Sequence, residues 1–151
     1  IGAAQLWLGW FFFNAASALS ANSVAVSTVM ATQIAAVSSG LVFYVSSKVY
    51  HRKPSVLALL NGLIAGMAGV TPASGYVDVT GAFVIGVVLG MTFWAAVFLK
   101  RVLRIDDALD VSIVHGLTGV IGSLAIGFLA TSDINPESAD GLFYGGEAAF
   151  V

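Results

Sequence analysis

The sequence predicts an all-α membrane protein with five transmembrane helices. Hydrophobic residues make up 58% of the 151 residues and charged residues only 9%, with a mean hydropathy of +0.95; soluble domains carry about 25% charged residues. Apolar stretches recur along the whole chain, unlike the single stretch of a cleaved signal peptide. The six basic residues gather in two short segments. A soluble fold is therefore excluded.

Glycine, proline, asparagine and charged residues separate helices that we predict over residues 2–20, 24–47, 55–71, 80–100 and 108–130, before a tail over 131–151. The first ends in the polar stretch SALSAN, and the second ends at a lysine. The third follows a proline, and its repeated glycines indicate burial among other helices. The fourth ends at a basic cluster, and the fifth follows the acidic stretch IDDALD. Each has about 17 to 24 residues, enough to cross a hydrocarbon core.

We interpret residues 1–151 as one transmembrane domain and expect it to be part of a longer chain, because it opens within an apolar stretch and without an initiator methionine. Five spans enter a membrane on one side and leave on the other. A duplicate that followed them would be inverted, as in many transporters.

The charges predict the orientation. The basic residues lie after the second and fourth helices, at Lys48, Arg52, Lys53, Lys100, Arg101 and Arg104. Because basic loops stay inside, we expect loops 48–54 and 100–107 to be cytoplasmic in a plasma or inner cell membrane. The other connections carry acids without lysine or arginine and are expected outside.

Three inner-side acids precede the fifth predicted helix. Asp106 and Asp107 are expected to cap its unpaired backbone N–H groups. Asp110 is expected one turn deeper in the helix, where we favour an ion pair with a basic loop residue over capping.

His115 lies in the apolar stretch VHGLTGVIGSLAIG, about 5 Å from the centre of the predicted helix. An imidazole there is costly against lipid, so we expect it to face a cavity or a hydrogen-bonding neighbour. Gly119 and Gly122 share its face and Gly116 adjoins it, which makes that face thin. The alternative is a histidine bonded to a neighbouring helix without a transport role.

Metal, cofactor and nucleic-acid binding are not expected. The second histidine, His51, lies in a basic loop, and the chain has no cysteine to complete a metal site. A net charge of −2 gives no indication of a nucleic-acid partner. An enzyme is disfavoured, because neither a nucleophile with its base nor a phosphate-binding loop is found.

The chain as a whole resembles the ammonium transporter family, the Amt/Mep/Rh proteins. The resemblance is carried, in order, by GWFFFNAASALSAN, TQIAA, KPSVLALLNGLIAGMAGVTPASGYV, GAFVIGVVLG, LKRVLRIDDALDVSIVHGLTGVIGSLAIGFLA and INPESADGLFYGG. It implies an eleven-helix fold of two inverted five-helix halves and a last helix, of which this chain resembles the second half.

The resemblance also implies functional residues. His115 is similar to the second of the family's twin pore histidines, and Phe13 to one of two phenylalanines over the outer pore entrance. Ser17 is similar to the serine that holds the incoming cation.

Further positions match the family's motifs. Trp10 and Asn14 are expected to serve mostly in packing, and Thr71 closes the third helix at the outer mouth. Asp107 and Asp110 match the inner-end acids. Two departures, Phe12 and Thr118 where the family has glycine, are expected to add bulk near the lumen.

The resemblance implies transport of ammonium or ammonia across the lipid bilayer by a homotrimer. The basic run from Lys48 to Lys53 is most simply an orientation signal, and docking of a cytoplasmic regulatory protein there is the alternative. Two alternatives stay open. One is a non-conducting ammonium sensor, and the other is a generic proton-coupled carrier with His115 as its relay.

Overall fold

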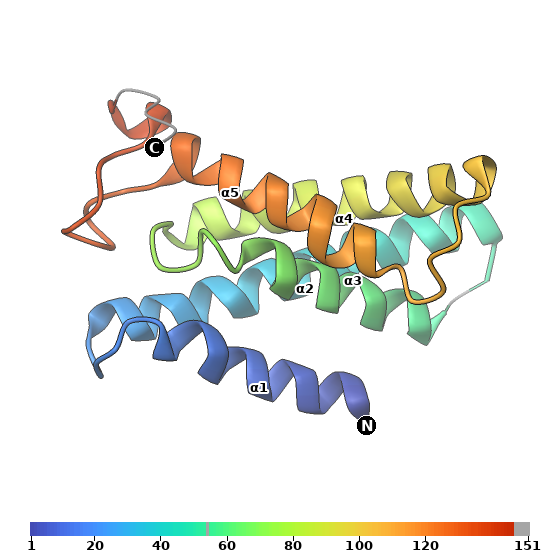
Figure 1. The fold of residues 1–151 in the computed structure, drawn as a ribbon, viewed down its shortest axis with the longest axis horizontal. Helices are drawn as coiled ribbons and strands as arrows, with labels where there is room; N and C mark the ends of the chain where they lie inside the picture. Colours follow the sequence, from blue (N-terminus) through green and yellow to red (C-terminus); the bar gives the residue numbers. More distant parts are fainter. Residues whose placement is uncertain (54, 147–151) are drawn as a thin grey trace.

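The computed structural model describes residues 1–53 and 55–146, and this part of the chain is helical (Figure 1). Its elements are α1 (Gly2–Ala16), α2 (Ser23–His51), α3 (Val56–Val70), α4 (Val79–Leu103), a π-helix η1 (Ser112–Leu117) continuous with α5 (Thr118–Leu129), and a short 3-10 turn η2 (Leu142–Tyr144). The all-helical fold class predicted from the sequence is thus confirmed.

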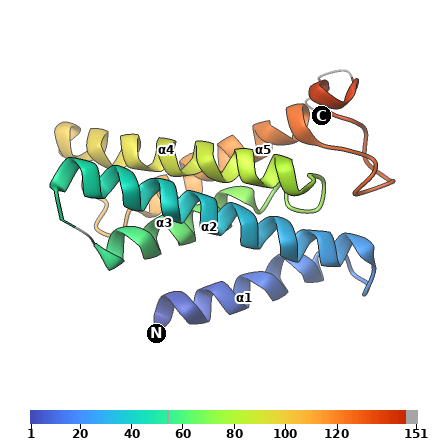
Figure 2. The same ribbon diagram turned by 180° about the vertical axis from the view of Figure 1, so that it is seen from behind.

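The helices run up and down, as the charge pattern predicted. Both basic connections, after α2 and after α4, lie at the end of the bundle where the N-terminus lies, and the other connections lie at the opposite end (Figures 1 and 2). We call these the basic end and the acidic end. The tail closes over the acidic end, where Thr131 N–H donates to the Tyr76 carbonyl at 2.8 Å and Gly141 N–H to the Ala130 carbonyl at 2.8 Å.

By length and composition, α2, α4 and the joined helix Ser112–Leu129 can each cross a membrane, while α3 is apolar but shorter. The predicted first helix, over 2–20, is too long, since α1 ends at Ala16. Beyond it Leu19 has a φ of 55°, and the Asn22 side chain instead caps α2 by accepting from Ala25 N–H at 2.9 Å. Asparagine is among the strongest N-caps, so the chain turns before residue 20.

The helix ends at the basic end also differ from the prediction. α2 continues past Lys48 to His51, and α4 past Lys100 to Leu103; Arg52 and Arg104, with φ of 55° and 56°, end them. Lysines in a last turn stabilise the negative end of the helix dipole, so they extend these helices instead of ending them.

The tightest packing joins α2, α3 and α4, which we call the body. Gly62, Gly66 and Gly69 of α3 are buried, as the sequence indicated. A Cβ atom on Gly66 would lie 2.5 Å from the Ala35 carbonyl oxygen, and one on Gly86 of α4 would lie 2.6 Å from the same oxygen. Three backbones meet here at a distance that only glycine permits.

Candidate functional site

His115 lies in η1, on a face that the rest of the chain leaves open. The side chain is exposed, and a Cβ atom added to Gly116 or Gly119 would have no described atom within 4 Å. The imidazole was expected about 5 Å from the helix centre, but the helix starts at Ser112 and not at residue 108. His115 is therefore its fourth residue and lies about 8 Å from the middle, nearer the basic end.

Trp10 connects this histidine to α1. Its indole lies parallel to the His115 ring, with centroids 6.2 Å apart and planes 13° apart. On its other side Phe13 meets it edge-on at 6.2 Å and 67°. The indole N–H donates to Thr71 Oγ1 at 2.8 Å. Four predicted site residues thus form one connected group, and Trp10 makes more specific contacts than the packing role expected of it.

A polar cavity of about 280 Å³ at the acidic end brings together three predicted residues, Asn14, Ser17 and Thr71. Asn14 is only 4% exposed and donates from Nδ2 to Thr32 Oγ1 at 2.9 Å. Its Oδ1 atom is buried and accepts no hydrogen bond from any described residue. Ser17 Oγ donates to the Phe13 carbonyl at 3.2 Å, so its lone pairs are available to accept an N–H bond.

The two bulky departures have different surroundings. Thr118 is fully buried, donates to the Val114 carbonyl and has its Cβ 2.9 Å from the position that a Cβ on Gly69 would take. The expectation that Thr118 adds bulk near a lumen is therefore wrong, because this side chain packs against α3. Phe12 is exposed, as is its neighbour Phe13 on the same helix.

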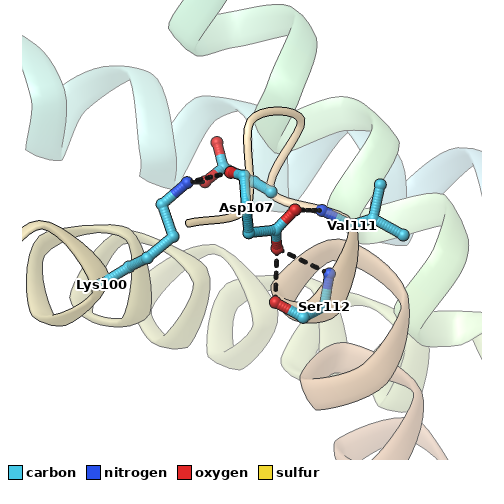
Figure 3. A network of polar contacts seen from close by, with 5 residues as sticks. Lys100, Asp107, Val111 and Ser112 are labelled. Atoms are coloured by element: carbon cyan, nitrogen blue, oxygen red, sulfur yellow. Dashed lines mark hydrogen bonds and ion pairs between the residues drawn. The ribbon is translucent and has the colours of Figure 1, made fainter. Parts of the chain in front are cut away.

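The inner-end acids form a clamp between α4 and η1 (Figure 3). Lys100 Nζ pairs with Asp110 and donates to the Asp107 carbonyl at 2.5 Å. Asp107 accepts from Val111 N–H at 3.0 Å, from Ser112 N–H at 2.9 Å and from the Ser112 hydroxyl. The Ser112 hydroxyl, more than the other contacts, holds the pKa of the Asp107 carboxyl below its usual value.

These contacts differ in part from the prediction. Asp107 holds the helix start, whereas Asp106 lies exposed in the preceding loop. Asp110 is not one turn inside the helix. It precedes η1 with a φ of 56°, and this left-handed residue is the reason that the helix starts late.

Two partners of site-bearing α1 were not identified from the sequence as functional residues. Gln33 Oε1 accepts from Trp7 Nε1 at 3.0 Å, and Thr32 accepts from Asn14. Both are polar residues in the middle of an apolar helix, and such residues require a partner. That signal was present in the stretch TQIAA.

The profile of the Ammonium Transporter Family matches residues 1–151. The chain belongs to this family. It is 53% identical over 146 residues to Ammonium transporter 1 of Dictyostelium discoideum, covering 96% of this chain and 31% of that protein. The crystal structure of the Mep2 mutant delta442 from Candida albicans superposes with a TM-score of 0.92 at 31% identity, over 99% of this chain and 39% of that one. A solved structure described as Sensor Amt Protein superposes with a TM-score of 0.81 at 30% identity, over 88% of this chain and 33% of that one.

The chain thus spans about a third of the length of the relatives it matches. Its helices have the arrangement of one part of the eleven-helix transporter fold, within a family of multi-pass membrane proteins. Of the relatives described above, the Dictyostelium protein is named as an ammonium transporter and one solved structure as a sensor, and none is named as an enzyme.

Proposed function

We propose that the chain forms one wall of an ammonia-conducting path, in a transporter that recruits ammonium at the acidic end and passes it along the His115 face. The observation that supports this most is the open face of η1 and α5, where an exposed imidazole stacked on Trp10 adjoins two glycines with empty space above them. A wall with these properties leaves room for a narrow path.

The chemistry of the substrate explains a mostly apolar path. Moving an intact ammonium-sized cation from water into hydrocarbon costs about 20 kcal/mol in the Born limit. Ammonium can leave a proton behind and cross as neutral ammonia, which potassium cannot do. An apolar path with a few polar groups therefore selects for ammonia.

Recruitment at the acidic end would use Phe13, Ser17 and Asn14. A phenyl face attracts a cation by roughly 0.5–2 kcal/mol, depending on how far water is excluded. The Ser17 hydroxyl can accept an N–H bond, and the buried Asn14 Oδ1 has its acceptor capacity unused among the described residues. These acceptors are neutral, so they bind a cation without trapping it.

His115 would act below this entrance. A neutral imidazole donates from one ring nitrogen and accepts at the other, and can therefore solvate ammonia or pass a proton along the path. Trp10 limits the movement of the ring by lying parallel to it. The loops 48–54 and 100–107 would face the cytoplasm of a cell with this protein in its plasma or inner membrane, as part of a homotrimer that a regulatory protein can contact.

The proposal is tested by uptake of labelled methylammonium in cells that lack their own ammonium transport and express the protein that carries this chain. We expect His115→Ala to reduce uptake strongly at unchanged protein levels in the membrane. His51→Ala is the matched control, because His51 lies at the basic end outside the site. Normal uptake by His115→Ala would contradict the proposal.

A sensor is the second candidate, since the chain superposes on a protein described as Sensor Amt Protein at 30% identity. A sensor keeps the cavity lined by Asn14 and Ser17 but needs no flux past His115. It predicts ammonium binding without uptake in the unmodified protein. A generic proton-coupled carrier instead predicts a substrate preference unrelated to ammonium, which competition between substrates measures.

A further inference from the structure

Three side-chain hydrogen bonds join α1 to the rest of the chain, beside the partly buried indoles of Trp7 and Trp10. All residues of α1 are described, and Asn14 is the only buried one among them. In both ribbon views α1 lies at the edge of the bundle, beside α2 (Figures 1 and 2). Only Trp7 and Trp10 of its larger side chains pack, partly buried, against the core, so the hydrogen bonds of these residues and of Asn14 can decide how α1 is rotated about its own axis.

One face of α1 carries three side chains that each bond to another helix or its cap residue. Positions 7, 10 and 14 follow the spacing that places side chains on a single helix face. The bonds run from Trp7 to Gln33 at 3.0 Å, from Trp10 to Thr71 at 2.8 Å and from Asn14 to Thr32 at 2.9 Å. We call these three bonds the α1 ladder.

The hydroxyl acceptors of the ladder are each held by a hydrogen bond to a carbonyl of their own helix. Thr71 donates its own proton to the Met67 carbonyl at 2.7 Å, and Thr32 donates to the Thr28 carbonyl at 2.7 Å. Each hydroxyl can then only accept from α1. This fixes the amide of Asn14 with its N–H group toward Thr32, and so turns its Oδ1 atom away from that bond.

We propose that Gln33, Thr32 and Thr71 are positioning residues that set the rotation of α1. The ladder holds Trp10 parallel to His115 and thereby Phe13 beside Trp10, since both rings project from the same two turns of helix. Gln33 is the informative member, because it touches neither His115 nor the cavity that Asn14 and Ser17 line. Its side chain bonds to α1 through Trp7, so we expect its effect on transport to pass through α1.

The transport part of this inference rests on the proposed function, whereas the structural part does not. We would compare Gln33→Met, which keeps the length of the side chain and removes the acceptor, with Gln33→Glu, which keeps an acceptor oxygen. Gln5→Met is the control on α1 itself, because Gln5 is an exposed glutamine of α1 that takes no part in the ladder. Thr71→Val removes a second bond of the ladder independently.

Two measurements are made on each variant in the protein that carries this chain. The indole N–H band of the ultraviolet resonance Raman spectrum reports loss of a tryptophan hydrogen bond, and methylammonium uptake gives KM and the maximal rate. We expect Gln33→Met and Thr71→Val to lose indole bonding and to lower the maximal rate by about two- to tenfold, the factor that corresponds to one net hydrogen bond. Gln33→Glu and Gln5→Met should keep both properties.

The outcomes separate the two claims. A lost indole bond with unchanged uptake in both Gln33→Met and Thr71→Val would overturn the positioning role, as would an unchanged Raman band in both. If Thr71→Val fails to fold, Gln33→Met decides. If Gln33→Met fails to fold, Thr71→Val decides through the maximal rate, because Thr71 also lines the cavity; a change in KM alone would then overturn the positioning role. If the unmodified protein takes up no methylammonium, the proposed function fails, and the Raman comparison still establishes whether the ladder exists.

Discussion

Glycine has opposite surroundings in two regions of this chain. In the body of α2, α3 and α4, Cβ atoms on Gly66 and Gly86 would lie 2.5 and 2.6 Å from one carbonyl oxygen, that of Ala35. On the face of η1 and α5 that carries His115, Cβ atoms on Gly116 and Gly119 would meet no described atom within 4 Å. The body uses glycine to bring backbones together, whereas the His115 face uses it to leave space.

The difference teaches that the two regions have different tasks. Close backbone packing makes the body a rigid support. The open face, the exposed imidazole and the polar cavity at α1 carry the features expected of a transport site. The Lys100 clamp joins the two, since it ties the end of α4 to the start of η1.

The largest expected effect is the difference in stability between adding one methyl group to a glycine of the body and adding one to a glycine of the His115 face. Gly66→Ala should destabilise the protein by about 1–3 kcal/mol or prevent folding, because the Ala35 carbonyl is backbone and cannot move aside. Gly119→Ala should leave stability nearly unchanged. Thermal unfolding of both purified variants measures this, and equal losses of stability would remove the distinction between the regions.

Breaking the clamp should have the next largest effect. Lys100→Met leaves Asp110 without its cation at a position where both side chains are largely buried, 16% and 21% exposed. We expect a loss of about 2 kcal/mol in unfolding free energy, in the range for removing one partner of a hydrogen-bonded charge. Arg101→Met is the control, since Arg101 is an exposed residue of the same helix end. If both variants unfold alike, the clamp does not connect the regions.

A smaller effect, with a characteristic pH dependence, is expected at Asp107. Its pKa is lowered below 3.8 in the folded protein, so the charged carboxylate stabilises the fold at pH values above 3.8. That contribution is lost as the pH falls through the lowered folded pKa. The melting temperatures of the unmodified protein and of Asp107→Asn should therefore differ at pH 7, and the difference should shrink as the pH falls below 3.8 and through the lowered pKa of Asp107. Asp106→Asn, in the same loop, is the control at pH 7, where it should leave the melting temperature unchanged.

The sequence predicted the helical class, the order of the helices and their alternation, because hydropathy and charge sorting are properties of single segments. Helix ends were less accurate. Leu19 is not a residue type that marks a left-handed break, so α1 was drawn too long, and Asp110 was interpreted as a residue inside the helix, so the fifth helix was expected too early.

Contacts between helices were the least predictable. The family resemblance identified His115, Trp10 and Asn14, but nothing in the spacing indicated that Trp10 lies on His115 or that Thr118 packs against Gly69. Such contacts depend on how whole helices are rotated against one another. Gln33 could be recognised in the sequence as a polar residue within an apolar helix. Its partner, Trp7, could be identified only from the fold.

The most direct test of the central claim is a series of increasing side chains at Gly119, measured for methylammonium uptake in the protein that carries this chain. If the His115 face borders the path, Gly119→Ala, Gly119→Val and Gly119→Phe should lower uptake stepwise, to below about one-tenth for phenylalanine, while the melting temperature and the amount in the membrane stay constant. Unchanged uptake by a stably folded Gly119→Phe variant would contradict the account.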